Sequence, residues 1–296
     1  MTVIGIFGPT ASGKSRVAAA VTGRIPADLV STDAMQAYEG LPILTNQGGD
    51  PARLVGIWPL AYEGSVGEYA RLAHAAIDEI LAAGRTPVVV GGTGLYLRAA
   101  LGELELPPAP EPGARERWEA FYDSGAGRAH AELTRLDAAA AAAVHPNDRR
   151  RVVRALELVE AGASLAPETK RLWTAETRHP TLLVGLEVPK DVLEARIRER
   201  TEAMFEAGVE EEVRNALAGP ISKTARKTLG LDEVAGLPRD EAIEAIVIRT
   251  RRYAAYQRKW MRRVPGLVKV DGDRPPGEIA DDIVALAGTR ERLPRR

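Results

Sequence analysis

A glycine-rich segment near the start of the chain constrains the fold more than any other feature. Residues 8–15 read G-P-T-A-S-G-K-S, directly after the apolar run 3–7 and directly before the helix-forming stretch 16–21. A buried strand, a glycine loop and a helix start form a phosphate cradle in this order, because the loop N–H groups and the helix N-terminus attract anions. Lys14 adds a positive charge, and the Ser15 hydroxyl can bind Mg²⁺. We therefore predict that a di- or triphosphate binds to Gly8, Thr10, Ala11, Ser12, Gly13, Lys14 and Ser15.

The composition is that of an ordinary folded protein and excludes several kinds of site. The chain has 296 residues, a length that suits one large domain or a domain with an insertion, and its net charge is -1. It contains no cysteine, which excludes disulfides, thiol nucleophiles and cysteine zinc sites, and its four histidines show no metal-ligand spacing. The first strand begins within two residues of Met1, and no apolar run approaches the roughly 20 residues that cross a bilayer. We expect a cytoplasmic protein without a signal peptide or a membrane partner.

Short apolar runs alternate with helix-forming stretches along much of the chain. Residues 28–31 and 86–90 have the character of buried parallel strands, and residues 67–83 between them have that of a helix. The other core elements that we predict are strands at 182–188 and 267–270 and helices at 189–205 and 276–287. This alternation predicts a P-loop NTPase-like α/β fold with a doubly wound parallel sheet.

The middle of the chain has a different composition. Residues 107–112, P-P-A-P-E-P, are incompatible with regular helix and central strand, and we interpret them as a stiff linker. Residues 114–177 are almost wholly helix-forming and carry apolar side chains to bury, which favours a helical domain over a disordered tract. We predict the first part of an α/β core at 1–101, a helical insertion domain at 102–180, and the second part of the core, with a basic helix and tail, at 181–296.

Two polar residues follow predicted strands at the edge of the sheet that holds the phosphate loop. Ligands gather at this edge in parallel α/β sheets. Asp33 either caps a following helix or holds Mg²⁺ through water, or it acts as a general base towards a second substrate. Thr93 lies in a glycine turn, where it serves only the turn or else bonds a phosphate oxygen or orients the base.

Two basic clusters indicate an anionic partner. Residues 149–154 contain four arginines on a predicted helix, which form either a solvated face or a phosphate-binding surface. A second predicted helix at 249–263 interleaves basic and aromatic residues, a pattern that suits nucleic acid and core packing about equally. Two such clusters on a nearly neutral chain favour a polyanion as partner.

Several segments occur in the order typical of one family. They are G-P-T-A-S-G-K-S from Gly8, S-T-D-A-M-Q-A-Y-E-G-L from Ser31, V-G-G-T-G-L-Y-L from Val90, D-R-R-R-V-V-R-A-L-E from Asp148, the segment 204–214, and T-R-R-Y-A-A-Y-Q-R-K-W from Thr250. Together they resemble the tRNA dimethylallyltransferases, or tRNA isopentenyltransferases, over most of the chain. The resemblance implies transfer of a dimethylallyl group from dimethylallyl diphosphate to the exocyclic N6 amine of the adenine 3′ of the tRNA anticodon, with release of diphosphate.

The resemblance also implies roles for the residues beside the phosphate loop. Lys14, the loop amides and Mg²⁺ on Ser15 would neutralise the departing diphosphate. Asp33 matches the catalytic aspartate and would accept a proton from the adenine amine, while Thr10 and Thr93 match positions on the diphosphate side. We therefore take Asp33, Thr93 and Lys14 as the candidate catalytic residues.

Further positions match the family's contacts with its substrates. Lys227, or its neighbour Arg226, falls at a basic position that we assign to the diphosphate. The segments that contact tRNA match Asp33, Ala34, Met35, Gln36, Arg150, Arg151 and Arg154. The target base would turn out of its loop, and the helical insertion would clasp the anticodon stem of the tRNA. We expect a monomer.

The chain departs from the family pattern at a few places, and two alternatives remain. The departures are residues 41–47, residues 54–58 where paired histidines are expected, and Leu231 after Gly230. The phosphate loop alone favours a nucleotide or small-molecule kinase that binds ATP, with the arginines of 149–154 as its lid. A tRNA-binding protein without catalysis is disfavoured, because the three candidate catalytic residues occur together.

Overall fold

The described residues of this computed structural model are 2–103, 111–165 and 176–292. They form two compact units. We call the first, made of the described residues up to 103 and from 176 onward, the core unit, and the second, residues 111–165, the helical unit. The predicted linker lies outside the described residues at 107–110, as does the part of the predicted helical stretch at 166–175.

The core unit contains a six-stranded parallel sheet with strand order β3-β2-β4-β1-β5-β6. In the central strands, Ile4 pairs with Val88 on one side and with Leu182 on the other. The strands are β1 (Val3–Phe7), β2 (Ala27–Ser31), β3 (Ala52–Arg53), β4 (Thr86–Gly91), β5 (Thr181–Glu187) and β6 (Val268–Asp271). The sheet confirms the predicted α/β fold, while the two-residue β3 is too short to produce a sequence pattern.

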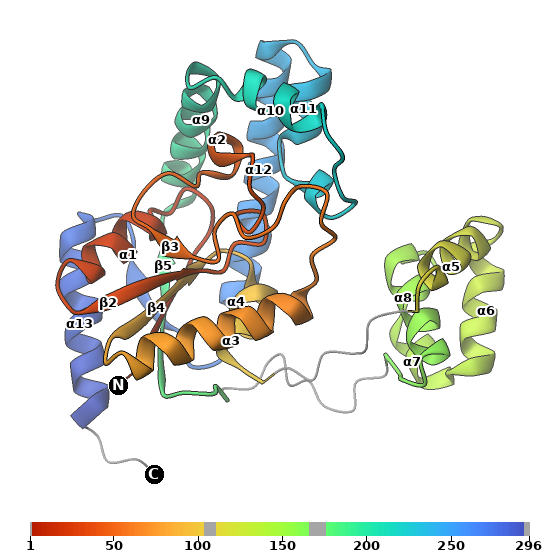
Figure 1. The fold of residues 1–296 in the computed structure, drawn as a ribbon, viewed down its shortest axis with the longest axis horizontal. Coiled ribbons are helices and arrows are strands. Elements are labelled where there is room, and N and C mark those ends of the chain that lie inside the picture. The colour runs from red at the N-terminus through yellow and green to blue at the C-terminus, as the bar shows by residue number, and fades with distance from the viewer. Residues whose placement is uncertain (1, 104–110, 166–175, 293–296) are drawn as a thin grey trace. The chain divides into compact units, whose positions relative to one another are not determined.

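Helices cover both faces of the sheet (Figure 1). Ile4 and Ile6 of β1 pack with α1 (Lys14–Thr22) and α13 (Pro276–Arg292). Val3 and Phe7, which alternate with them, pack on the opposite face with α3 (Val66–Ala82) and α4 (Gly94–Leu101). Because both faces are buried, the central strands are almost continuously apolar, which is why their sequence identifies them.

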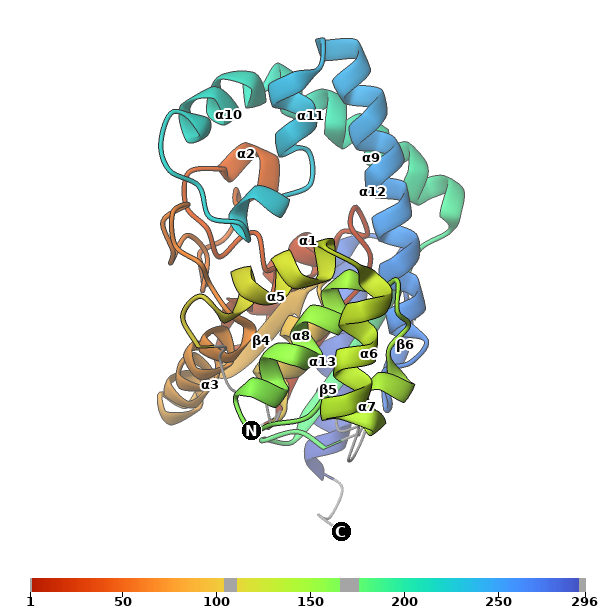
Figure 2. The same ribbon diagram turned by 90° about the vertical axis from the view of Figure 1, so that its right-hand side faces the viewer.

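A third group of helices lies beyond the carboxyl ends of the strands. Leu44, Met204, Val213 and Ile246 are buried in its apolar core. Figure 2 shows these helices together on one side of the sheet, with α12 as the longest of them. They are α2 (Pro42–Thr45), α9 (Lys190–Glu206), α10 (Val209–Leu217), α11 (Leu231–Gly236) and α12 (Arg239–Met261). This group of helices covers the edge of the sheet where the phosphate loop lies.

The helical unit has its own apolar core, which includes Tyr122, Leu133 and Leu156. The Asp137 carboxylate caps the polyalanine helix by accepting from the Ala140 N–H at 2.9 Å, and the Asp148 carboxylate caps the arginine-bearing helix by accepting from the Arg151 N–H at 3.1 Å. The unit contains α5 (Ala114–Asp123), α6 (Ala126–Leu136), α7 (Ala138–Ala143) and α8 (Arg149–Glu160).

The histidines have ordinary structural partners. The rings of His74 and His130 bond backbone carbonyls, and His179 pairs with Asp78. Within the three described stretches of the chain, no three His, Asp or Glu side chains are grouped as a metal site would require. In the same stretches, no helix has the length and apolar character of a membrane span.

Candidate active site

The loop between β1 and α1 has the geometry of an anion cradle. Gly13 has a φ of 84°, which favours glycine, and the helix that begins after it has no side-chain cap, so its first N–H groups are available to a ligand. The Ser12 hydroxyl is buried without a hydrogen-bond partner among the described residues. A buried, unsatisfied hydroxyl next to a helix N-terminus suits an anion that supplies the missing acceptor.

Lys14 is half-buried in this loop. Its ammonium donates a hydrogen bond to the Pro9 carbonyl at 2.7 Å. Burial lowers the pKa of Lys14 to about 8, although the negative charge of Asp33 raises it in part and Arg200 lowers it further. The group is therefore still mostly protonated at neutral pH, and a bound anion would favour its charged form.

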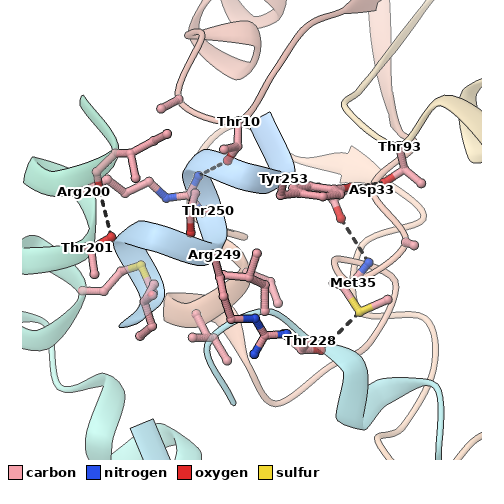
Figure 3. A pocket seen from close by; sticks show the side chains of 18 of the residues that line it. Thr10, Asp33, Met35, Thr93, Arg200, Thr201, Thr228, Arg249, Thr250 and Tyr253 are labelled. Carbon is pink, nitrogen blue, oxygen red and sulfur yellow. Dashed lines mark hydrogen bonds between the residues drawn. The ribbon is translucent and has the colours of Figure 1, made fainter. Parts of the chain in front are cut away.

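Asp33 lies just beyond β2, where the chain turns. One carboxylate oxygen accepts from the Met35 N–H at 3.0 Å, and the residues that follow form a turn. The helix-capping alternative is therefore wrong, because no helix begins there and the carboxylate instead stabilises a local turn. This turn fixes the backbone of Asp33 on the sheet edge, beside Thr93 and Tyr253 (Figure 3).

Asp33 lies where two cavities meet. The cradle cavity, of about 690 Å³, contains Lys14 and Ser15 in its wall, and the apolar cavity, of about 350 Å³, is walled by side chains such as Met204 and Ile246. The residues that line both cavities are Thr10, Ala11, Asp33, Thr45, Arg200 and Tyr253. An anion in the first cavity and an apolar or aromatic group in the second would thus meet at the Asp33 carboxylate.

Arg200 was not among the predicted site residues, although it lies at this junction. One guanidinium nitrogen donates to the Thr10 hydroxyl at 3.3 Å. Burial lowers its pKa, against the opposing effect of the Asp33 charge. The sequence did contain one signal for Arg200: its helical spacing places it on the same side of α9 as the buried Ile197 and Met204.

Thr93 reaches the site from the loop after β4. Its hydroxyl lies 3.3 Å from the Tyr253 hydroxyl of α12, and both side chains line the apolar cavity. Burial, followed by the nearby charge of Asp33, raises the pKa of Tyr253 to about 12. Tyr253 therefore presents a neutral hydroxyl beside the carboxylate at physiological pH.

The predicted tRNA-contacting segment after Asp33 is partly engaged within the core unit. Ala34 and Met35 line the apolar cavity. The Gln36 amide donates to the Thr45 and Asn46 carbonyls, at 3.1 and 2.8 Å. Gln36 thus ties the turn to α2, the segment that departs from the family pattern.

The carboxylate of Glu212 holds α2 from its other side. Its two oxygens accept from the N–H groups of Ile43 and Leu44 at 2.7 and 2.8 Å. Leu44 belongs to the wall of the apolar cavity. Glu212 therefore fixes one wall of the site from α10.

Lys227 lies on a short 3₁₀ turn, η2 (Ala225–Lys227), and is exposed. It lines the apolar cavity, as does Arg249, but it is not among the residues that line the cradle cavity. Its assignment to the diphosphate stays a prediction, whereas Arg16, Arg196 and Arg200 line the cradle cavity together with Lys14.

The arginines of α8 differ in their engagement. Arg154 pairs at 3.0 Å with the fully buried Glu157, which also pairs with Arg115 at 2.7 Å. Arg151 lies 3.6 Å from Asp148, and Arg150 is exposed without an acidic partner among the described residues. Arg150 and Arg151 are therefore the more available of the predicted tRNA contacts.

Comparison with known proteins places the chain in a family. The sequence model of the IPP transferase family matches residues 36–264. A tRNA dimethylallyltransferase of Thermobifida fusca is 39% identical over 304 residues, which covers 96% of this chain and 94% of the relative. That of Salinispora tropica is 39% identical over 284 residues, 91% and 88% of the two chains.

Solved structures agree with this assignment. The tRNA isopentenylpyrophosphate transferase of Bacillus halodurans superimposes with a TM-score of 0.71 at 30% identity, over 98% of this chain and 97% of the other. A eukaryotic dimethylallyltransferase acting on tRNA has the same fold, with a TM-score of 0.78 at 21% identity over 100% and 81% of the chains. The kinase alternative is not favoured by these relatives. The chain is a transferase and belongs to the tRNA dimethylallyltransferase family.

Proposed function

We propose that this protein transfers the dimethylallyl group of dimethylallyl diphosphate to the exocyclic N6 amine of the adenine 3′ of the tRNA anticodon. The position of Asp33, where an anion cradle and an apolar cavity meet, is the observation that carries the proposal. The carbon–oxygen bond to the diphosphate breaks, the bond between the amine nitrogen and the allyl carbon forms, and the amine proton passes to the Asp33 carboxylate. Its relatives named tRNA dimethylallyltransferase support this choice of substrates.

The cradle stabilises the departing diphosphate. Negative charge on the leaving group grows as the carbon–oxygen bond breaks, and preorganised donors in a buried site stabilise this charge strongly. The free N–H groups at the start of α1, the Lys14 ammonium and the Arg200 guanidinium supply these donors. The Thr10 N–H does not take part, because it is already donated to Gln257.

The cradle also fits a hydrated Mg²⁺ ion. Ser15 and Asp33 both line the cradle cavity and offer oxygen ligands, and Mg²⁺ in such sites binds to one or two protein oxygens, substrate phosphates and water. Ser15 would hold the ion, with Asp33 within the same cavity. When bound, the ion would neutralise part of the diphosphate charge.

The apolar cavity suits the reacting groups. The adenine amine is a weak nucleophile because its lone pair is delocalised into the ring, so removal of its proton as the bond forms assists the attack. Asp33 lies at the cavity edge to receive that proton, and the apolar walls exclude the water that would otherwise capture the allyl carbon. The base must leave its loop to enter, at a cost of a few kcal/mol.

The helical unit is the proposed clasp for the anticodon stem. Arg150 and Arg151 are exposed on α8, and one guanidinium group can bind two phosphate oxygens at once.

We place the reaction in the cytoplasm, with a monomer as the active form.

Reaction of the purified protein with an anticodon stem-loop tests this proposal. Dimethylallyl diphosphate and Mg²⁺ are added, and the nucleosides are analysed by mass spectrometry. We expect one dimethylallyl group on the adenosine 3′ of the anticodon, and none on a matched stem-loop with guanosine at that position. Phosphoryl transfer from labelled ATP without alkylation of the RNA would support the kinase alternative instead.

A further inference from the structure

A single buried carboxamide joins the two loops that bracket the reaction site. Gln257 of α12 is 3% exposed. Its Oε1 accepts a hydrogen bond from the Thr10 N–H at 2.8 Å, and its Nε2 donates one to the Gly92 carbonyl at 2.9 Å. Thr10 belongs to the phosphate loop after β1, and Gly92 belongs to the loop after β4. The side chain is therefore a bridge between neighbouring strand ends.

The chemistry of the bridge requires a carboxamide. The phosphate loop presents an N–H donor and the other loop presents a carbonyl acceptor, so the bridging group must accept on one side and donate on the other. The space is also closed, because a Cβ at Gly92 would overlap Gln257 Nε2 and lie 3.0 Å from the Gly8 carbonyl. Neither a longer nor a purely apolar side chain can maintain both bonds.

Neighbouring positions of α12 hold the same loop. Tyr253, one turn before Gln257, lies with its hydroxyl 3.3 Å from that of Thr93. Trp260, one turn after, packs where a Cβ on Gly94 would overlap its ring. The helix thus contacts the loop after β4 and the first residue of α4 from three successive turns, and Gln257 also bonds the phosphate loop.

The bridge also orients Thr10 towards the cradle. With its N–H bound to Gln257, Thr10 directs its hydroxyl to the Arg200 guanidinium at 3.3 Å (Figure 3). The resulting chain of contacts runs from the Gly92 carbonyl through Gln257 and Thr10 to Arg200. It connects Arg200, which lines the cradle cavity, with the loop that carries Thr93.

We propose that Gln257 is a positioning residue for the transfer reaction. It fixes the anion cradle relative to the strand ends that carry Thr93 and Asp33. The departing diphosphate and the incoming amine then lie on opposite sides of the allyl carbon. The inference rests on the proposed function. Because a displacement of reacting groups by about 1 Å can cost on the order of 10²-fold in rate, the bridge contributes to kcat more than to binding of tRNA.

Two substitutions test the bridge. Gln257→Met keeps the length of the side chain and removes both bonds, and we expect kcat to fall roughly 10²-fold while the KM for tRNA changes by less than about 3-fold. Gln257→Glu keeps the shape, but an ionised carboxylate cannot donate to the Gly92 carbonyl, whereas a protonated one can. We expect the ratio of its kcat to that of the wild type to rise as the pH falls.

A matched control separates positioning from stability. His74→Leu also removes a side chain that bonds backbone carbonyls, those of Ala99 and Gly102, but away from both cavities. It should lower the melting temperature and leave kcat per folded molecule unchanged. If Gln257→Met behaves in the same way, or if the Gln257→Glu ratio does not change with pH, the proposal is overturned. The Gln257→Glu result decides if Gln257→Met does not fold.

A second measurement does not require the alkylation reaction. Titration of Mg²⁺ and inorganic diphosphate into the wild type and Gln257→Met reports on the cradle alone. We expect the variant to bind several-fold more weakly, because Thr10 and Arg200 lose their fixed positions. Equal affinities would contradict the bridge. A wild type that binds diphosphate but alkylates no tRNA would instead contradict the proposed function.

Discussion

Two cations of the candidate site and two arginines of α8 are held in opposite ways. Lys14 and Arg200 are half-buried, and no carboxylate forms an ion pair with either among the described residues. Their hydrogen-bond partners are a backbone carbonyl and a hydroxyl. In the helical unit, Arg149 makes a two-pronged contact with Asp123, at 2.8 Å for each bond, and Arg154 pairs with Glu157. The first two cations have the Asp33 charge nearby but no carboxylate in ion-pair contact, whereas the second two are each paired with a carboxylate of the protein.

This difference indicates where binding energy is available. A buried cation without a counter-charge is costly to maintain, and a bound anion removes that cost. A cation that is already paired gains little from an additional anion, since the protein carboxylate competes for it. The core unit is therefore preorganised for a small, highly charged ligand, whereas the exposed Arg150 and Arg151 suit the extended phosphates of RNA.

The largest expected effect follows from removal of the base at the junction of the two cavities. Asp33→Asn should lower kcat by about 10²- to 10⁴-fold, because the amide cannot accept the amine proton. Affinity for inorganic diphosphate should not weaken, since the substitution removes a negative charge near Lys14 and Arg200. Single-turnover rates and a diphosphate titration measure the two quantities. An Asp33→Asn variant with unchanged product formation would remove the assignment of the base.

Lys14 should produce the next largest effect, with a characteristic pH dependence. Lys14→Met should lower the rate of transfer by about 10²- to 10³-fold, as for other lost transition-state donors. In the wild type, diphosphate affinity should fall as the pH rises through about 8, because the neutral amine no longer attracts the anion. The pH dependence of diphosphate affinity in Lys14→Met serves as the control, because it contains the titration of diphosphate but not that of Lys14. The same pH dependence in both proteins would contradict this role of Lys14.

The sequence was sufficient for features that depend on neighbouring residues. The first strand, the loop with Lys14 and Ser15, and Asp33 at a strand end all follow from local apolar runs and loop chemistry. Such features need only the period of a strand or a helix and the preferences of glycine and small polar residues.

Features that depend on distant contacts were not predicted. The four-residue α2 is too short for a pattern and is held by Glu212, far along the chain. Arg200 lies in the same charged stretch as Arg196 and Arg198, which instead pair with Asp273 and Glu244. The register of Arg200 with Ile197 and Met204 places it on the packed side of α9, but the packing of α9 against α12, which makes it a partly buried cation, is a long-range contact.

In the helical unit, the paired arginine should matter for stability. Arg154→Ala leaves the buried Glu157 with Arg115 as its remaining partner, and we expect a loss of about 1–3 kcal/mol in the free energy of unfolding of this unit. Denaturant unfolding measures the change. Glu157→Gln combined with Arg154→Ala should lose less than Arg154→Ala alone, because no buried charge is then left partly unpaired. A stability loss equal to that of Arg150→Ala would contradict the structural role of the pair.

The exposed arginine should have the smallest and most specific effect. Arg150→Ala should leave unfolding unchanged and weaken tRNA binding a few-fold, because it removes one phosphate contact. The slope of log affinity against log salt should become shallower by about one unit or less. Binding of the anticodon stem-loop at several salt concentrations measures this slope, with Arg135→Ala as a control because Arg135 pairs with Glu132 on α6. An unchanged slope would show that α8 does not contact the RNA backbone through Arg150.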